Sequence, residues 1–360
     1  MSGLARRSGQ RAARRTGQEA PRLGKRLARV VVVFVVTGIV GLVAGYGVGP
    51  EHFWLPALAQ YVPYPAFLLA SLIAVGFSLA LGWAFRLAAL VGLALVVTIV
   101  MGVEFKRSET GSGQVRLMTY NIKDYVATHQ ASGLAEIARE IDRHDPDIIV
   151  LQDARQLADD DSAKEVLKVL GDRSKFSFGQ YVVASRFPLR NCARGDISFR
   201  LEAHTYVTCL VAAHGVEFEL VTAHFITPRS ALTAVRNNPL GAIGEWKESI
   251  ADRMTQAEKL AWDLRSPQRP LIVAGDFNAP NTSLVVRTLF EIGLRDAFAV
   301  AGLGYGYTWG HSLRFGFSFL RIDHILVGPE FAVADCFVGG ALGSEHRPVI
   351  ADLYLTRGGS

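Results

Sequence analysis

The sequence predicts a mixed α/β domain that is preceded by three transmembrane helices. Three apolar stretches without a charged residue lie within the first 103 of the 360 residues. From Gln114 onward, short apolar runs typical of strands alternate with loops and a few helical patterns. No repeat at the periods of solenoid proteins occurs, and the length allows one large domain beside the membrane region.

The charge of the chain is concentrated at its start. The formal net charge is +5, but residues 1–29 carry nine basic side chains and one acid, which leaves −3 for all the other residues. The part after this basic tail therefore has no global positive field of the kind that drives nucleic-acid binding, although local basic patches are allowed.

Residues 30–103 are predicted to contain three spans, at 30–48, 64–81 and 87–103. Each stretch is close to the ~20 apolar residues that a helix needs to cross a bilayer. A buried helical hairpin is the alternative for the last two stretches, and their lack of charge disfavours it. A cleaved signal peptide is the alternative for the first, and the basic tail is long for one.

The basic residues predict the orientation of these spans. The tail is expected in the cytoplasm because positively charged segments stay on that side, whereas the loop 51–63 has no Lys or Arg and is expected outside. The third span then delivers the rest of the chain to the outer side. We therefore expect a multi-pass protein of a bacterial-type plasma (inner) membrane, with its large domain extracytoplasmic.

Residues 104–113 are predicted as a linker because the stretch from Lys106 is polar and contains Gly and Ser. The predicted domain covers residues 114–356. Its expected strands are 115–120, 148–151, 181–184, 218–223, 271–274, 325–327 and 349–355, and its expected helices are 134–144 and 284–292.

The three cysteines are Cys192, Cys209 and Cys336, and no pair has the spacing of a zinc site. Cys192 and Cys209 flank neighbouring predicted strands and could pair in an oxidising compartment. Buried free thiols are the favoured interpretation.

Polar side chains recur where the predicted strands end. Asp276 and Asn278 follow the apolar run 271–274, and a turn alone would explain one such case. Several cases suggest a single rim, with Asn121, Asp153, His224, Asp276, Asn278, Asp323, Glu345 and His346. Carboxylate and amide oxygens suit Mg²⁺ or Mn²⁺, and histidines suit proton transfer. Together they fit metal-assisted hydrolysis of a phosphate ester.

The segments TYNI, IIVLQD, VASRFPL, TAHF, GDFNAP, YTW, RIDHILV and SEHRPV occur in the order found in the endonuclease/exonuclease/phosphatase superfamily. The chain resembles this superfamily over residues 114–356. Its members include DNase I-like nucleases, neutral sphingomyelinases and inositol-polyphosphate 5-phosphatases. The resemblance implies an α/β (α+β) four-layer sandwich, with two packed mixed sheets flanked by helices and the site at one end of the sheets.

The resemblance also implies catalytic roles. Asp276 would orient the attacking water, and Asn278 would hold the transition-state oxygen. His224 would steady the phosphate or protonate the leaving oxygen. His346 would act as general base or contact the phosphate, with Asp323 fixing its ring.

By the same resemblance, Asp153, Asn121 and Glu345 would bind the metal. Two of them depart from the family pattern, because Asp153 replaces a Glu and Glu345 replaces an Asp. The two exchanges can compensate for each other or can mean lost catalysis. Arg186 can anchor a phosphate through its guanidinium fork, and a structural ion pair is the alternative.

These expectations add up to a membrane-anchored, Mg²⁺- or Mn²⁺-dependent phosphoesterase. Its partners would be a phosphodiester substrate, either lipid or nucleic acid, and the lipid bilayer, with no protein partner inferred. An extracytoplasmic endonuclease or exonuclease acting on DNA is one alternative. A non-catalytic membrane-anchored binding domain is the other.

Overall fold

The computed structural model describes residues 3–130, 132–158, 164–314 and 316–355, with only the backbone described for residues 3–22, 156 and 158. Residues 1–2 of the predicted tail and residues 131, 159–163, 315 and 356 of the predicted domain lie outside the described residues. The chain forms two compact units. The first comprises residues up to 48 together with 62–102, and the second comprises Gly49–Tyr61 together with the residues from 103 onward.

The first unit consists of three helices, of which two are long and apolar enough to span a membrane. They are α1 (Gly3–Val48), α3 (Pro65–Ser78) and α4 (Trp83–Leu95), and α4 continues into the short π-helix η2 (Val96–Val100). The candidate spans are Leu23–Val48 and Trp83–Val100, whereas α3 is apolar but only 14 residues long. Three helices of spanning length were predicted, so the middle one is shorter than expected.

The outer faces of these helices carry large apolar side chains that no other part of their unit covers. Exposed examples are Val30, Phe34, Leu69, Leu72, Leu87 and Leu90. Small residues, among them Ala28, Ala74 and Ala89, are buried where the helices pack together, as is common between helices in a membrane.

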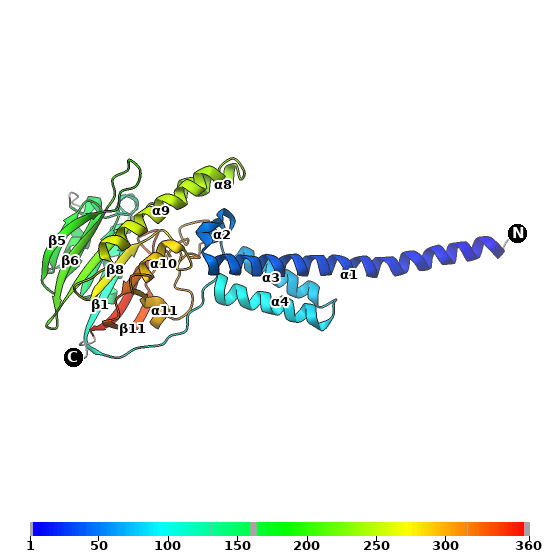
Figure 1. The fold of residues 1–360 in the computed structure, drawn as a ribbon, viewed down its shortest axis with the longest axis horizontal. Coiled ribbons are helices and arrows are strands. Elements are labelled where there is room, and N and C mark those ends of the chain that lie inside the picture. The colour runs from blue at the N-terminus through cyan, green and yellow to red at the C-terminus, as the bar shows by residue number, and fades with distance from the viewer. Residues whose placement is uncertain (1–2, 131, 159–163, 315, 356–360) are drawn as a thin grey trace. The chain divides into compact units, whose positions relative to one another are not determined.

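The second unit contains two six-stranded mixed sheets (Figure 1). The first sheet has the order β11-β12-β1-β2-β4-β3, formed by β1 (Ser112–Asn121), β2 (Ile148–Gln152), β3 (Ser174–Phe178), β4 (Tyr181–Ser185), β11 (Phe331–Val338) and β12 (Val349–Leu355). The second has the order β5-β6-β7-β8-β10-β9, formed by β5 (Leu189–Asp196), β6 (Thr205–Ala213), β7 (Val216–His224), β8 (Leu271–Asp276), β9 (Arg295–Asp296) and β10 (Asp323–Val327).

Helices cover the outer face of each sheet. The helices of this unit are η1 (Pro50–His52), α2 (Trp54–Ala59), α5 (Asp124–Ala127), α6 (Gly133–His144), η3 (Arg155–Ala158), α7 (Lys164–Leu170), α8 (Arg229–Asn237), α9 (Ile243–Leu264), α10 (Leu284–Phe290) and α11 (Ala297–Ala301). Apolar residues of α6 and α7 pack on the first sheet, and those of α9 and α10 pack on the second. Figure 1 shows α9 lying along the sheet that contains β6 and β8.

Alternating side chains of the central strands explain why their sequences are apolar throughout. In β8, Ile272 and Ala274 point into the core between the sheets, whereas Leu271 and Val273 pack against the covering helices. A strand covered on both faces has no polar side, because successive side chains point to opposite faces. The predicted four-layer sandwich is confirmed.

Two segments outside the sheets are fixed to this unit. The main chain of Glu104, in the predicted linker, exchanges hydrogen bonds of 2.7 and 3.0 Å with Gly304. The Glu109 carboxylate accepts hydrogen bonds from Arg295 and from the main-chain N–H of Val333. The other segment is Gly49–Tyr61, the greater part of the predicted outer loop.

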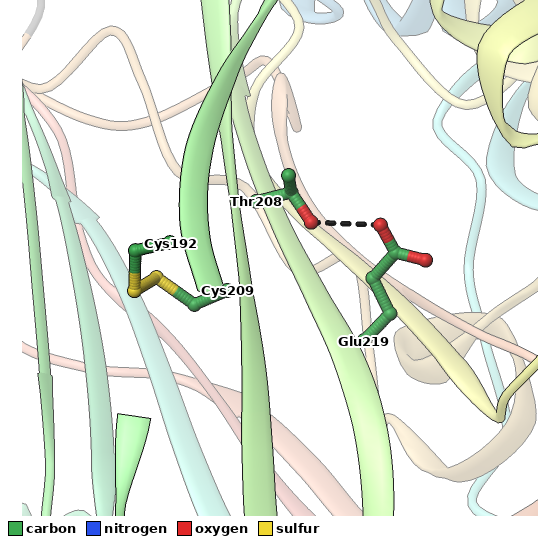
Figure 2. Close-up of a disulfide and its surroundings, with 4 residues drawn as sticks. All are labelled: Cys192, Thr208, Cys209 and Glu219. Carbon is green, nitrogen blue, oxygen red and sulfur yellow. Dashed lines mark hydrogen bonds between the residues drawn. A yellow bond between two sulfur atoms is a disulfide. The ribbon is translucent and has the colours of Figure 1, made fainter. Parts of the chain in front are cut away.

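Cys192 and Cys209 form a disulfide between β5 and β6 (Figure 2). The expectation that they are free thiols was therefore wrong. The pairing register of β5 shifts between Arg190 and Ala193, so a bulge brings Cys192 beside Cys209, with 4.1 Å between their Cα atoms. A bulge of this kind cannot be inferred from strand periodicity. Cys336 is a buried free thiol.

Candidate active site

The strand directions bring most of the predicted residues to one edge of the sandwich. Parallel pairing places Asn121 at the end of β1 beside Gln152 at the end of β2, and it places His224 at the end of β7 beside Asp276 at the end of β8. The antiparallel strand β10 begins at this edge, with Asp323 opposite Asp276. Asn121 Nδ2 donates to Asp276 Oδ2 at 2.9 Å, which joins the two sheets.

Three buried side chains form a compact cluster at this edge. Potential ligand atoms of Asp276, Asp323 and His346 all lie within 4.8 Å of one another. His346 Nδ1 is 2.9 Å from Asp323 Oδ2, so the carboxylate fixes the ring and accepts a hydrogen bond from the Nδ1–H. Nε2 then lies 3.8 Å from Asp276 Oδ2.

The charges of this cluster shift its proton affinities. Burial disfavours the charged imidazolium, but Asp323 and Asp276 outweigh this effect and raise the pKa of His346. Burial, followed by repulsion from Asp323, raises the pKa of Asp276. The buried Asp276 carboxylate therefore lacks sufficient positive charge from the protein. This shortage, together with the surrounding oxygen donors, fits a bound divalent cation.

His224 lies between two carboxylates. Its Nδ1 is 3.6 Å from Asp153 Oδ1, and its Nε2 is 3.5 Å from Asp276 Oδ2. Gln180 Oε1 is 2.7 Å from Nδ1, and because an amide oxygen only accepts, it favours a proton on that nitrogen. The main-chain N–H of His224 donates to the hydroxyl of Tyr181 at 2.9 Å. These contacts fix the ring at the edge of the second sheet.

Lys123 is a site residue that the sequence did not indicate. Its Nζ donates to Asp153 Oδ2 at 2.7 Å, and the two side chains are only 10% and 14% exposed. Burial alone would raise the pKa of Asp153, but His224 and Lys123 outweigh it and lower the pKa. Burial alone would lower the pKa of Lys123, but the negative charge of Asp153 outweighs it and raises this pKa. Both partners therefore stay charged.

Asn278 is held by its main chain as well as by its side chain. Its backbone is left-handed, with φ of 48°, and its N–H donates to Asp276 Oδ1 at 2.8 Å. Nδ2 donates to the carbonyl of Phe225 at 2.9 Å. Its own carbonyl accepts a hydrogen bond from the hydroxyl of Tyr61 at 2.9 Å, a partner 217 positions away.

The structure does not bring Glu345 or Arg186 into this cluster. Glu345 Oε2 pairs with Arg229 Nη2 at 3.0 Å. Arg186 pairs with Asp145 and with Asp147, which agrees with the alternative prediction that it forms a structural ion pair. It follows the end of β4, which is antiparallel to β2, so it lies beside the start of β2 and at the opposite edge from Asp153.

Comparisons with known proteins agree with this fold. The structure resembles the endonuclease/exonuclease/phosphatase of Bacteroides vulgatus at 18% identity and a TM-score of 0.54, covering 68% of this chain and 100% of that one. It also resembles truncated Caenorhabditis elegans TDP2 at 17% identity and a TM-score of 0.51, covering 67% of this chain and 97% of that one. Identities this low support the fold alone. No curated protein matches the chain by sequence.

The family model described as Endonuclease/Exonuclease/phosphatase family matches residues 118–346, which is more than half of the chain. Members of this family are phosphoesterases, among them nucleases and phosphatases, and generally depend on a divalent metal. The matched region contains every residue of the buried cluster and its neighbours at the sheet edge. The chain therefore belongs to the endonuclease/exonuclease/phosphatase family.

Proposed function

We propose that this chain is a membrane-anchored phosphoesterase that uses Mg²⁺ or Mn²⁺ to hydrolyse a phosphodiester. The observation that carries the proposal is the buried cluster of Asp276, Asp323 and His346. Two carboxylates buried side by side are costly unless a cation or substrate chemistry requires them.

Asp153 and Asn121 would hold the ion beside Asp276. When bound, the ion would neutralise charge on the phosphoryl oxygens. Glu345 is left out of this set because it is paired with Arg229. The ion would share the Asp153 carboxylate with the ammonium group of Lys123.

The protein residues would divide the proton chemistry. Asp323 holds the Nδ1–H of His346, so Nε2 can accept a proton from a water molecule that Asp276 orients. Asn278 and His224 would stabilise charge that develops on the phosphoryl and leaving oxygens.

The test is hydrolysis of bis(p-nitrophenyl) phosphate by the full chain in detergent. We expect activity that requires Mg²⁺ or Mn²⁺, that a chelator removes and that His346→Ala abolishes. His214→Ala is a matched control, because this exposed ring hydrogen-bonds to the main chain of Gln114 and packs edge-on against Phe187, and neither residue belongs to the cluster. Equal rates for the two variants, or a rate unaffected by chelator, would remove the proposed mechanism and favour a non-catalytic binding domain.

The natural substrate class can be separated by a panel of DNA, RNA, sphingomyelin and phosphoinositides. We favour a lipid, because the chain beyond its basic tail carries a net charge of −3 and lacks the surplus of cations that neutralises nucleic-acid phosphates. A lipid enzyme should depend only weakly on salt. Cleavage of DNA with a steep fall in affinity as salt rises would favour the nuclease alternative.

The membrane topology that we propose has three crossings. Gly49–Tyr61 and the residues from 103 onward fold as one unit, so they must lie on the same side of a membrane. The chain between them then crosses an even number of times. If α4 crosses, α3 must cross too, although its 14 residues span only about 21 Å. Local thinning of the bilayer accommodates short spans.

Two further observations support an outer location for the second unit. The nine cations of the tail favour a cytoplasmic N-terminus, and the disulfide between Cys192 and Cys209 suits an oxidising compartment. Protease added to intact spheroplasts should degrade the second unit. Digestion that occurs only after lysis would overturn this orientation.

A further inference from the structure

The segment Gly49–Tyr61 is separated in sequence from the rest of its unit by the helices α3 and α4. Ala57 of α2 is buried in an apolar cluster with Ala231 and Val235 of α8 and Trp246 of α9. Trp246 Nε1 donates to the carbonyl of Trp54 at 3.0 Å. The segment is therefore a packed element of the catalytic unit.

The same segment contacts the chain that directly follows Asp276. The carboxylate of Glu51 accepts hydrogen bonds from the hydroxyl of Ser283 and, at 2.8 Å, from the N–H of Leu284. Gln60 Oε1 accepts a hydrogen bond from the hydroxyl of Thr282 at 2.9 Å. Glu51 and Gln60 also bond to each other at 3.1 Å, so the two ends of the segment act as one support.

Tyr61 extends this support to Asn278. Its ring stands edge-on to Trp246, with 5.6 Å between the ring centroids, and its hydroxyl donates to the Asn278 carbonyl at 2.9 Å. Burial raises the pKa of Tyr61 to about 12, so the hydroxyl keeps its proton throughout the range in which proteins are stable. The left-handed backbone of Asn278 thus has a fixed anchor on the side that faces the segment.

We infer that Tyr61 is a positioning residue for catalysis and that the segment Gly49–Tyr61 completes the active site. Tyr61 acts through Asn278, because a tethered carbonyl fixes the turn from which the Asn278 side chain projects. The membrane region would then contribute part of the catalytic machinery through the loop between its first two helices. Only the kinetic part of this inference rests on the proposed phosphoesterase function.

The test compares Tyr61→Phe with Tyr206→Phe in the full chain. Each change removes one hydroxyl that has a protein partner, but Tyr206 bonds to Asp263 and has no bond to the site. With bis(p-nitrophenyl) phosphate and Mg²⁺, Tyr61→Phe should lower kcat about 10-fold with little change in KM, because small misplacements of a catalytic group are costly. Tyr206→Phe should leave kcat unchanged.

A double-mutant cycle separates positioning from a general loss of structure. In an Asn278→Ala background, Tyr61→Phe should lower kcat less than about twofold, because the side chain that it positions is gone. An equal loss in both backgrounds would overturn the inference, as would a wild-type kcat in Tyr61→Phe.

Amide hydrogen exchange provides a readout that does not need activity. Tyr61→Phe should speed exchange at Phe277 and Asn278, whose amides donate to Ile322 and Asp276, and Tyr206→Phe should not. If the wild-type chain hydrolyses no phosphodiester, the proposed function fails while exchange still decides whether Tyr61 holds this turn. Unchanged exchange in Tyr61→Phe would then refute the inference.

Discussion

Replacing Lys123 with Met tests whether a metal ion binds to Asp153, the carboxylate that forms a buried ion pair with Lys123. The change keeps most of the side-chain length and removes the ammonium group that lies 2.7 Å from the carboxylate. Asp153 then keeps His224, whose Nδ1 is 3.6 Å away, as its main potential positive partner, with a smaller contribution from His346. The variant therefore leaves a largely buried carboxylate short of positive charge.

The expected loss of folding stability in this variant is large without metal and small with it. Removing one partner of a buried ion pair typically costs about 3–5 kcal/mol, and we expect the lower figure because both side chains keep some exposure. At about 2–4 °C per kcal/mol for a domain of this size, the melting temperature should fall by about 6–12 °C in chelator. A divalent ion at 100 times its Kd adds about 2.7 kcal/mol, and it should bind the variant more tightly because no ammonium group competes for Asp153.

Thermal unfolding followed by tryptophan fluorescence, with chelator or with saturating Mg²⁺, measures both losses. Lys106→Met is a matched control, because Lys106 pairs with Asp335 at 2.9 Å with side chains 41% and 37% exposed. Such surface pairs contribute about 0–1 kcal/mol, whatever the metal. A loss for Lys123→Met that is the same with and without Mg²⁺ would refute the placement of the ion at Asp153.

Two further predictions concern carboxylates that the sequence assigned to the site. Asp323→Asn should lower kcat at least about 100-fold and move the rise of rate with pH to lower pH, because Asp323 raises the pKa of His346. A raised histidine pKa stabilises the fold below about pH 6.5 and not above the folded-state pKa, so the stability deficit of this variant, measured by urea unfolding, should shrink as pH rises. Asp153→Glu should lower kcat/KM, whereas Glu345→Asp should change it little, and the double variant should show the loss of Asp153→Glu alone to within about 0.5 kcal/mol, because the two acids have different basic partners. Recovery of activity in the double variant, assayed against metal concentration, would instead mean that they share an ion.

The central strands and the candidate cluster could be predicted because both depend on local pattern and strand direction. The apolar run 271–274 identifies β8, and Asp276 follows it. Since β1 and β2 are parallel, as are β7 and β8, their ends meet at one edge. Residues that end these strands, such as Asn121 and His224, therefore converge once this parallel pairing is formed.

The placement of Arg186 shows where that reasoning fails. It also follows an apolar run, but β4 is antiparallel to β2, and its end lies at the opposite edge. The apolar pattern of a strand carries no information about its direction in the sheet. Strand ends are thus candidates for a site only after the pairing is known.

Long-range partners were missed for a different reason. Tyr61 stands 217 positions from Asn278, and nothing in its own neighbourhood sets it apart from an interfacial tyrosine. Lysine is usually exposed at the protein surface, and only the fold shows that the ammonium group of Lys123 is enclosed beside Asp153. The register shift that pairs Cys192 with Cys209 is likewise set by the neighbouring strand.

The backbone of the site gives independent support for a functional role. Among the described residues, seven non-glycine residues have a left-handed backbone, and three of them are Lys123, Asp153 and Asn278, with φ of 44°, 48° and 48°. Such a conformation costs about 1–2 kcal/mol for a residue with a Cβ, less for Asn and Asp, whose short polar side chains tolerate it. Each of the three stands one or two residues after a strand end, where a sharp change of direction keeps the side chain at the edge of the sheet. The Lys123 side chain lacks this tolerance, so the buried contact with Asp153 must offset the cost of its left-handed backbone. That contact is the one that a bound ion would modify.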